Sequence, residues 1–200
     1  MTASKNPFAG FYYSSEELRD FGFKSVGRNV KIHSKASLYC PENIQLGDNI
    51  RIDDFTVIIA TGPLVVGSFV SIPNFCFLGS KHGMYFGDFA TLAPGVKIFT
   101  SSDDYLGDKL TNVTVPPEYT GGSHGPVRIG RHVILGAQTV VLPDLTVGEG
   151  CSVGACSLVK ASLDSWGVYA GVPARRLKNR RKDLLELEKK LLDENKLRRA

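Results

Sequence analysis

The sequence predicts a parallel β-solenoid with a triangular cross-section, and three observations lead to this prediction. Large apolar residues recur every six positions, glycine follows many of them, and a small or branched residue stands four positions after many of them. A period of six is neither that of a helix nor that of a simple alternating strand. It fits three short extended faces joined by tight corners, because one large side chain fills the interior at each face and a small one fits each corner.

The large apolar residues lead eighteen hexads, which group into about six coils of three over residues 26–170. An ordinary β-sandwich would not keep a fixed phase across so many segments. The leading residues, in order, are Val26, Ile32, Leu38, Leu46, Ile52, Ile58, Val66, Ile72, Leu78, Phe86, Leu92, Ile98, Ile129, Leu135, Val141, Val147, Val153 and Val159.

The segments on either side of the repeat predict helices. Within residues 1–25, Ser14 and Glu17 have the spacing of a capping box, so we expect an N-terminal helical cap over the open end of the solenoid. Residues 171–200 predict a tail and a helix that opens at Asp183 and carries a leucine stripe. We expect that stripe to pack on the solenoid or on a neighbouring subunit, because acidic residues on its polar face argue against a membrane.

Composition bounds the class of protein. With 200 residues, 42% hydrophobic and 22% charged, the chain is expected to be globular, and no apolar run approaches the ~20 residues of a membrane helix. The start of the chain lacks the order of a signal peptide, so we expect a cytoplasmic protein without membrane insertion. The net charge of +4 reflects basic residues near the C-terminus and does not imply nucleic acid. Four scattered cysteines predict reduced thiols, with neither zinc nor disulfides.

The run from Ile129 to Lys160, followed by Tyr169-Ala-Gly-Val-Pro-Ala-Arg175, resembles the hexapeptide-repeat acyltransferases. It is most similar to the branch with the galactoside and maltose acetyltransferases and the sugar acetyltransferases of bacterial cell-surface polysaccharides. The resemblance implies a left-handed β-helix, a homotrimer, and acetyl-CoA as the acyl donor in a groove between neighbouring subunits.

The six-residue phase is lost at about 99–128, in a stretch rich in polar residues, Pro and Gly. A long irregular insertion in a compact repeat is more often functional than idle, so we expect an acceptor-site loop. The relatives usually read Ile-Tyr-Thr-Ala-Thr-His at its entry, where the His is the general base, whereas this chain reads Ile98-Phe-Thr-Ser-Ser-Asp103. An unperturbed Asp, with a pKa of ~4, is a weak base for a sugar hydroxyl, which favours an amine as acceptor.

Coils 2, 3 and 4 advance by 20 residues, so position 82 is expected to stack beneath position 102. We therefore predict that His82 lies beside Asp103 and acts as the base, with Asp103 or Asp104 orienting its ring. The alternative for His82 is a corner residue bonded to the backbone, and His124 or Asp103 could be the base instead. We expect His33 and His132 to be exposed to solvent.

The remaining site residues follow from the loop and from the resemblance. Tyr105, Asn112 and His124 are expected to line the acceptor pocket, unless the loop only bonds to itself through Asx-turns. The resemblance implies that the pantetheine arm of acetyl-CoA lies along small residues of the last two coils. These are Gly136, Ala137, Gly154 and Ala155. It also implies that cations bind the phosphates, unless they are merely solvated: Lys160, Arg175, Arg176 and Lys178.

These observations together favour an N-acetyltransferase that acts on an amino sugar, in a nucleotide-linked form destined for O-antigen or another surface polysaccharide. A sugar O-acetyltransferase is the nearest rival. A metal enzyme similar to the γ-class carbonic anhydrases fits poorly, because it would need three converging histidines on zinc, and no metal is expected here. A non-catalytic scaffold is the fourth possibility, which the long insertion argues against.

Overall fold

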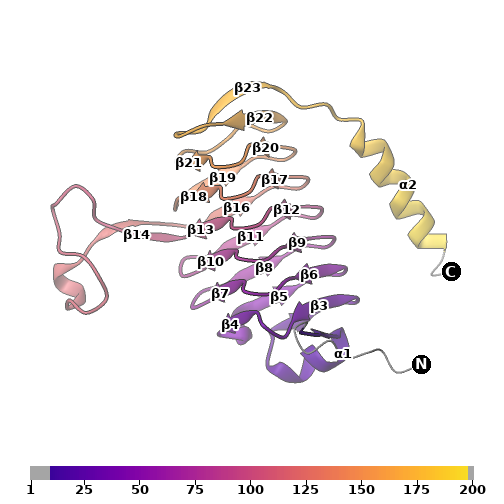
Figure 1. Ribbon diagram of the computed structural model, residues 1–200, viewed down its shortest axis with the longest axis horizontal. Coiled ribbons are helices and arrows are strands. Elements are labelled where there is room, and N and C mark those ends of the chain that lie inside the picture. The colour runs from indigo at the N-terminus through magenta and orange to yellow at the C-terminus, as the bar shows by residue number, and fades with distance from the viewer. Residues whose placement is uncertain (1–9, 198–200) are drawn as a thin grey trace.

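The computed structural model describes residues 10–197, which form a left-handed parallel β-helix. Three sheets of 9, 6 and 6 strands run along the three faces of a triangular prism (Figure 1). A hairpin of β14 (Ser101–Asp103) and β15 (Gly122–His124) projects from one side of the prism, and α2 (Leu184–Leu197) stands beside another. The solenoid predicted from the six-residue period is therefore confirmed.

The strands of each sheet come from successive coils. Sheet A contains β1 (Tyr12–Tyr13), β3 (Val30–His33), β6 (Ile50–Ile52), β9 (Ser71–Ile72), β12 (Thr91–Leu92), β17 (Ile134–Leu135), β20 (Ser152–Val153), β22 (Gly167–Ala170) and β23 (Arg175–Asn179). Sheet B contains β2 (Ser25–Val26), β5 (Ile44–Leu46), β8 (Leu64–Val66), β11 (Met84–Phe86), β16 (Val127–Ile129) and β19 (Leu145–Val147). Sheet C contains β4 (Ser37–Tyr39), β7 (Val57–Ile59), β10 (Phe77–Gly79), β13 (Lys97–Phe99), β18 (Val140–Val141) and β21 (Leu158–Val159).

The expected coils are present, and the structure adds part of a further one. Strand β22 continues sheet A in parallel, and Leu163 forms a bridge to Val147 of sheet B. The outermost strands β1 and β23 run antiparallel to their neighbours. Because these antiparallel strands cover both ends of sheet A, its parallel edges are not left open for pairing with another chain.

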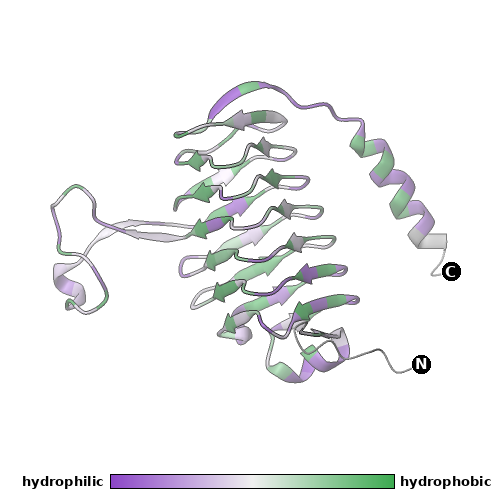
Figure 2. Ribbon diagram, in the orientation of Figure 1, coloured by the Kyte–Doolittle hydropathy of each residue, from purple (hydrophilic) through white to green (hydrophobic). Residues whose placement is uncertain are grey.

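The leading residues of the hexads fill the interior. Leu78 pairs with Ile58 in the coil below and with Ile98 in the coil above, and all three side chains are fully buried. The small corner residues, such as Thr56 and Cys76, are buried as well. Hydrophobic residues therefore follow the strands along the prism (Figure 2). Burial of one such aliphatic side chain contributes roughly 1.5–3 kcal/mol, and the repeat supplies this contribution at every face.

The predicted cap covers the first coil. Helix α1 (Ser15–Leu18) continues into the short helix η1 (Arg19–Phe21), and a second short helix, η2 (Pro41–Asn43), lies at a corner of the first coil. Ser14 and Glu17 form the expected capping box, in which the Ser14 hydroxyl accepts the Glu17 N–H and the Glu17 carboxylate accepts the Ser14 N–H. Leu18 is only 1% exposed and joins the core, so this segment closes the solenoid at its start.

The prediction that His33 and His132 are solvent-exposed is wrong. His33 is 8% exposed, because Tyr12 packs edge-on against its ring at 5.0 Å. His132 is 7% exposed, because it stacks on Phe89 at 5.1 Å and lies under Glu188 of α2. The covering residues Tyr12 and Glu188 belong to the two ends of the chain, outside the repeat from which the outward positions were inferred.

Helix α2 is tied to the solenoid by one carboxylate. Glu188 accepts a hydrogen bond from Nε2 of His132 at 2.8 Å and pairs with Arg131. Just before the helix, the Arg180 guanidinium donates to three backbone carbonyls of the adjacent corners, those of His132, Gly150 and Cys151.

The leucine stripe of α2 is only partly covered in the single chain. Leu187 is 69% exposed and Leu191 is 40% exposed. These side chains line a cavity of about 340 Å³ between the helix and sheet A, together with Ile134. Within residues 10–197, no helix has the length and apolar character needed to cross a membrane.

We expect Glu188→Ala to release α2 from the solenoid. Removing the carboxylate leaves the half-buried charge of Arg131 without its partner, and breaking such a pair favours the detached helix by a factor of ~10 or more. Limited proteolysis at the basic segment 180–182 measures this release. Glu186→Ala, on the exposed side of the same helix, is the matched control, and equal cleavage rates in the two variants would show that Glu188 does not hold the helix.

Candidate active site

The insertion begins as regular structure rather than as the irregular loop expected. Strands β14 and β15 pair in antiparallel register, with Ser101 opposite His124 and Asp103 opposite Gly122. Beyond this two-stranded stem, the loop carries one short helix, η3 (Pro117–Tyr119). The hexad phase ends here because the chain stops adding to sheet C and pairs with itself.

Thr100 anchors the stem to the coil below. Its side chain is fully buried, and its hydroxyl donates to the Gly79 carbonyl at 2.8 Å. The same oxygen accepts the backbone N–H groups of Lys81 at 2.8 Å and His82 at 3.1 Å. The Thr100 carbonyl accepts the N–H of Gly125, the residue after β15. One threonine therefore fixes the turn that carries His82 and both strands of the hairpin.

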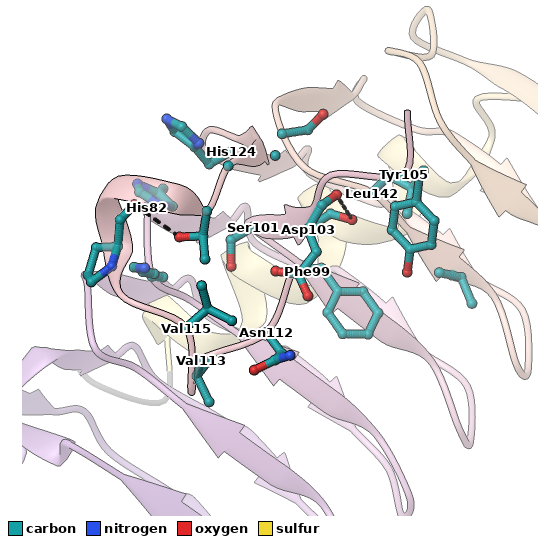
Figure 3. Close-up of a pocket in the computed structure, with 18 residues that line it drawn as sticks. His82, Phe99, Ser101, Asp103, Tyr105, Asn112, Val113, Val115, His124 and Leu142 are labelled. Carbon is teal, nitrogen blue, oxygen red and sulfur yellow. Dashed lines mark hydrogen bonds between the residues drawn. The ribbon is translucent and has the colours of Figure 1, made fainter. Parts of the chain in front are cut away.

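A cavity of about 890 Å³ lies between the hairpin and the outer face of sheet C (Figure 3). Apolar side chains of the sheet, Phe99, Val140 and Leu142, form one part of its wall. Five of the residues predicted to act on the acceptor line it: His82, Asp103, Tyr105, Asn112 and His124.

His82 does not form the predicted pair with Asp103. Both residues line the cavity, but no hydrogen bond joins them in the described part of the chain, and the His82 ring instead stacks on His124 with the ring centres 4.8 Å apart. The reason is the direction of the chain: β14 leaves the coil at Ser101, so positions 102 and 103 no longer stack on positions 82 and 83. The catalytic roles of these residues stay predictions.

Partial burial lowers the pKa of His82, and the neighbouring His124 and Lys81 lower it further. Burial disfavours the charged imidazolium, and two nearby groups that can carry positive charge act in the same direction. These effects all favour the neutral, proton-accepting form of the His82 ring.

Asp104 turns away from the cavity. Its carboxylate accepts the backbone N–H groups of Leu106 and Lys109, both at 2.7 Å, which is the Asx-turn alternative raised from the sequence. These bonds, that from Leu106 foremost, lower the pKa of Asp104. Asn112 behaves similarly, since its side-chain oxygen accepts hydrogen bonds from the N–H and hydroxyl of Thr114, although it also lines the cavity.

The residues predicted to bind the acyl donor lie on the last coils. Gly136 stacks over Gly154, and Ala137 over Ala155, at the corner between sheets A and C. A Cβ atom on Gly136 would lie 2.5 Å from the backbone nitrogen of Ala155, so no side chain fits there. Glycine is therefore required at position 136 by the packing of successive coils, and its neighbours at this corner, Ala137, Gly154 and Ala155, are small as well.

The predicted phosphate-binding cations are all exposed. Arg175, Arg176 and Lys178 lie on β23, where Arg176 also donates to the Tyr169 hydroxyl at 3.1 Å. Lys160 follows β21 and sits one coil beyond Leu142 of the cavity wall. Lys160 thus lies next to the cavity wall, at the opposite end of the sheet C strands from the corner of small residues.

Sequence reasoning did not identify Thr100 or the cavity wall. Thr100 belongs to the run Ile98-Phe-Thr-Ser-Ser-Asp103, in which Asp103, standing in place of the relatives' His, was the residue predicted to have a role. The sequence feature that could have identified it is a threonine at the point where the six-residue repeat stops. A buried hydroxyl there can form hydrogen bonds with backbone groups that lose their partners where the chain leaves the sheet.

Residues 126–161 match the family described as bacterial transferase hexapeptide (six repeats). The dTDP-4-amino-4,6-dideoxy-D-glucose acyltransferase of Escherichia coli is 41% identical over 178 residues, which are 88% of this chain and 93% of that protein. A variant of AntD, an N-acyltransferase from Bacillus cereus, in complex with dTDP-4-amino-4,6-dideoxyglucose and coenzyme A, has a TM-score of 0.89 at 40% identity, covering 92% of this chain and 99% of that chain. AntD in complex with dTDP and 3-hydroxybutyryl-CoA also has a TM-score of 0.89, at 39% identity over 94% and 99% of the two chains.

The coils and the cavity beside them, with these comparisons, define an acyltransferase of the hexapeptide-repeat class. More narrowly, the chain belongs to the family of the Escherichia coli dTDP-4-amino-4,6-dideoxy-D-glucose acyltransferase.

We expect Asp104→Ala to loosen the tip of the insertion without unfolding the solenoid. The variant loses the acceptor for two N–H groups, so hydrogen exchange at Leu106 and Lys109 should rise by ~10-fold. Because the pKa of Asp104 is lowered in the fold, its contribution is present at neutral pH and is lost as the pH falls through that pKa. Asp108→Ala is the control, and unchanged exchange in Asp104→Ala would refute this role.

Proposed function

We propose that this enzyme transfers the acetyl group of acetyl-CoA to the amino group of a nucleotide-linked amino sugar destined for O-antigen or another surface polysaccharide. The observation that carries the proposal is the cavity beside sheet C, in which His82 of the coil stacks on His124 of the inserted hairpin. The named substrate of the Escherichia coli relative and the ligands of AntD support the same chemistry.

The lowered pKa of His82 favours an amine over a hydroxyl. A sugar hydroxyl is a very weak acid and needs a strong base during attack, whereas an amine attacks in its neutral form and gives up its proton afterwards. In the proposed reaction the amine nitrogen bonds to the thioester carbonyl, His82 takes the proton from that nitrogen, and the coenzyme A thiolate leaves and is protonated. The products are an amide and free coenzyme A.

The transfer is proposed to be direct, without an acyl-enzyme. None of the four cysteines, Cys40, Cys76, Cys151 and Cys156, lines the cavity. Burial raises the pKa of Cys76 to about 11 and raises that of Cys151 as well, so neither thiol forms the reactive thiolate at neutral pH.

Donor binding is proposed to follow the corner of small residues. The pantetheine arm would lie along Gly136, Ala137, Gly154 and Ala155, and the phosphates would meet the exposed cations at the end of the solenoid. That group comprises Lys160, Arg175, Arg176 and Lys178.

A homotrimer is part of the proposal. The outer face of sheet C carries the half-buried side chains of Ile59, Phe77 and Phe99, and at its edge Phe55 stacks on Phe75 although these are 50% and 57% exposed. An apolar face of this kind is typical of a subunit interface. Sedimentation should return about three times the chain mass of 21.8 kDa. We place the enzyme in the cytoplasm, where its coenzyme A thioester is available.

The function is tested by incubating the purified protein with acetyl-CoA and two acceptors, dTDP-4-amino-4,6-dideoxyglucose and its analogue with a hydroxyl in place of the amine. Release of the coenzyme A thiol together with a product heavier by one acetyl group is expected only with the amine. A parallel reaction with 3-hydroxybutyryl-CoA compares acyl groups. Turnover of the hydroxyl sugar alone would establish the O-acetyltransferase instead.

Two variants should distinguish a residue that acts as the general base from one that binds the acyl donor. His82→Asn is expected to lower kcat by ~100-fold or more, with little change in the Kd of coenzyme A, because it removes only the proton acceptor. Lys160→Ala is expected to show the opposite pattern, a Kd raised by ~3–10-fold with the acceptor preference retained. Isothermal titration calorimetry and steady-state kinetics measure both. Wild-type kcat in His82→Asn would remove His82 from the base role.

A further inference from the structure

Two imidazole rings stand face to face at the cavity. His82 comes from the turn between β10 and β11, and His124 ends β15, yet their ring centres are 4.8 Å apart with an angle of 27° between the planes (Figure 3). Both side chains line the cavity, and both are otherwise exposed in the single chain. Two titratable imidazole rings are therefore in direct contact at the wall of the cavity.

Their separation is set by the backbone on both sides. Thr100 accepts the N–H of His82 through its hydroxyl and the N–H of Gly125, next to His124, through its carbonyl. Ser101, the next residue, pairs with His124 across the hairpin. Because a single buried threonine holds both segments, the backbones that carry the two rings stay side by side as long as the root of the hairpin is intact.

Stacked imidazoles at this separation resist double protonation. The first proton can settle on either ring, but a second would place two positive charges side by side, with Lys81 adding a third. Among the other titratable residues of the cavity, Asp103 is not hydrogen-bonded to His82 in the described part of the chain, and Tyr105 is 89% exposed on the hairpin. Asp104 is engaged in its own turn.

We propose that His82 and His124 act as a coupled pair that holds a single proton, and that this proton is the one His82 accepts from the reacting amine while both rings are still neutral. This inference rests on the proposed function for its role in catalysis. In the transfer, the amine nitrogen bonds to the carbonyl carbon and loses its proton to His82, so that the pair then carries one positive charge. The carbon–sulfur bond then breaks, and the leaving thiolate takes up that proton. His124 is thus a positioning residue that acts through His82.

The coupling is measured by NMR titration of the imidazole Cε1–H resonances in the full-length protein. In the wild type, the His82 resonance should follow a broad or two-step curve, because its charge depends on that of His124. In His124→Gln, which keeps a polar side chain but cannot be charged, the curve should become a single step with its midpoint higher by ~0.5 pH unit. Lys81→Gln is the matched control, since it removes a neighbouring cation and should leave the two-step shape.

Kinetics then test whether the pair serves the reaction. The acid limb of the pH profile of kcat/KM should move to higher pH in His124→Gln, in step with the His82 midpoint. An identical His82 titration in the wild type and His124→Gln would overturn the coupling. A shifted titration with an unmoved acid limb would overturn the catalytic role of the pair. If no amino sugar is turned over, the proposed function fails, while the titration curves still decide whether the rings are coupled.

Discussion

The site depends on the strict stacking of one coil upon the next. Leu78 pairs with Ile98 at the interior, and the backbone beyond each of them reaches the same corner one strand spacing apart. At that corner the buried hydroxyl of Thr100 accepts the backbone N–H groups of Lys81 and His82 in the coil below. The residue after Thr100 begins the hairpin. A buried hydroxyl with three partners is strongly directional, since leaving any of the backbone groups unpaired would be costly. Hydrophobic stacking thus positions the coils, and one polar side chain positions the reactive groups.

Much of the fold could be predicted because the repeat applies the same physical demand at every face. Leu78 and Ile58 had to be large, and Cys76 and Thr56 had to be small, so their burial followed from the spacing alone. The capping box of Ser14 and Glu17 could also be predicted, because its two partners are only three residues apart in the sequence. Constraints that are local or periodic produce patterns that can be detected in a single sequence.

The errors arose where the chain leaves the repeat. The expected stacking of Asp103 near His82 assumed that the register continued past Thr100, but the hairpin pairs with itself and turns away. Burial of His132 could not be foreseen, because Glu188 lies far along the chain and has no periodic relation to it. The cavity was predicted as a site, and five of its residues were named, but the stacking of His82 on His124 has no signature in spacing.

The solenoid and the hairpin contribute different parts of the proposed site. The last coils provide a corner of small residues, where Gly136 lies so close to the backbone of the next coil that no side chain fits, and this close packing depends only on the repeat. The hairpin supplies most of the polar groups of the cavity, and its tip is held by local bonds such as those of Asp104. Changes in the hairpin can therefore alter the acceptor without disturbing the coils, as is usual when loops on a rigid scaffold carry specificity.

The most direct test of this account is a crystal structure of the enzyme with coenzyme A and dTDP-4-amino-4,6-dideoxyglucose bound together. The account predicts that the sugar nitrogen lies within about 3 Å of a ring nitrogen of His82, or is joined to it through one water, with the coenzyme A sulfur on the other side of that nitrogen. A sugar bound elsewhere, with its amine facing neither imidazole of the cavity, would contradict it.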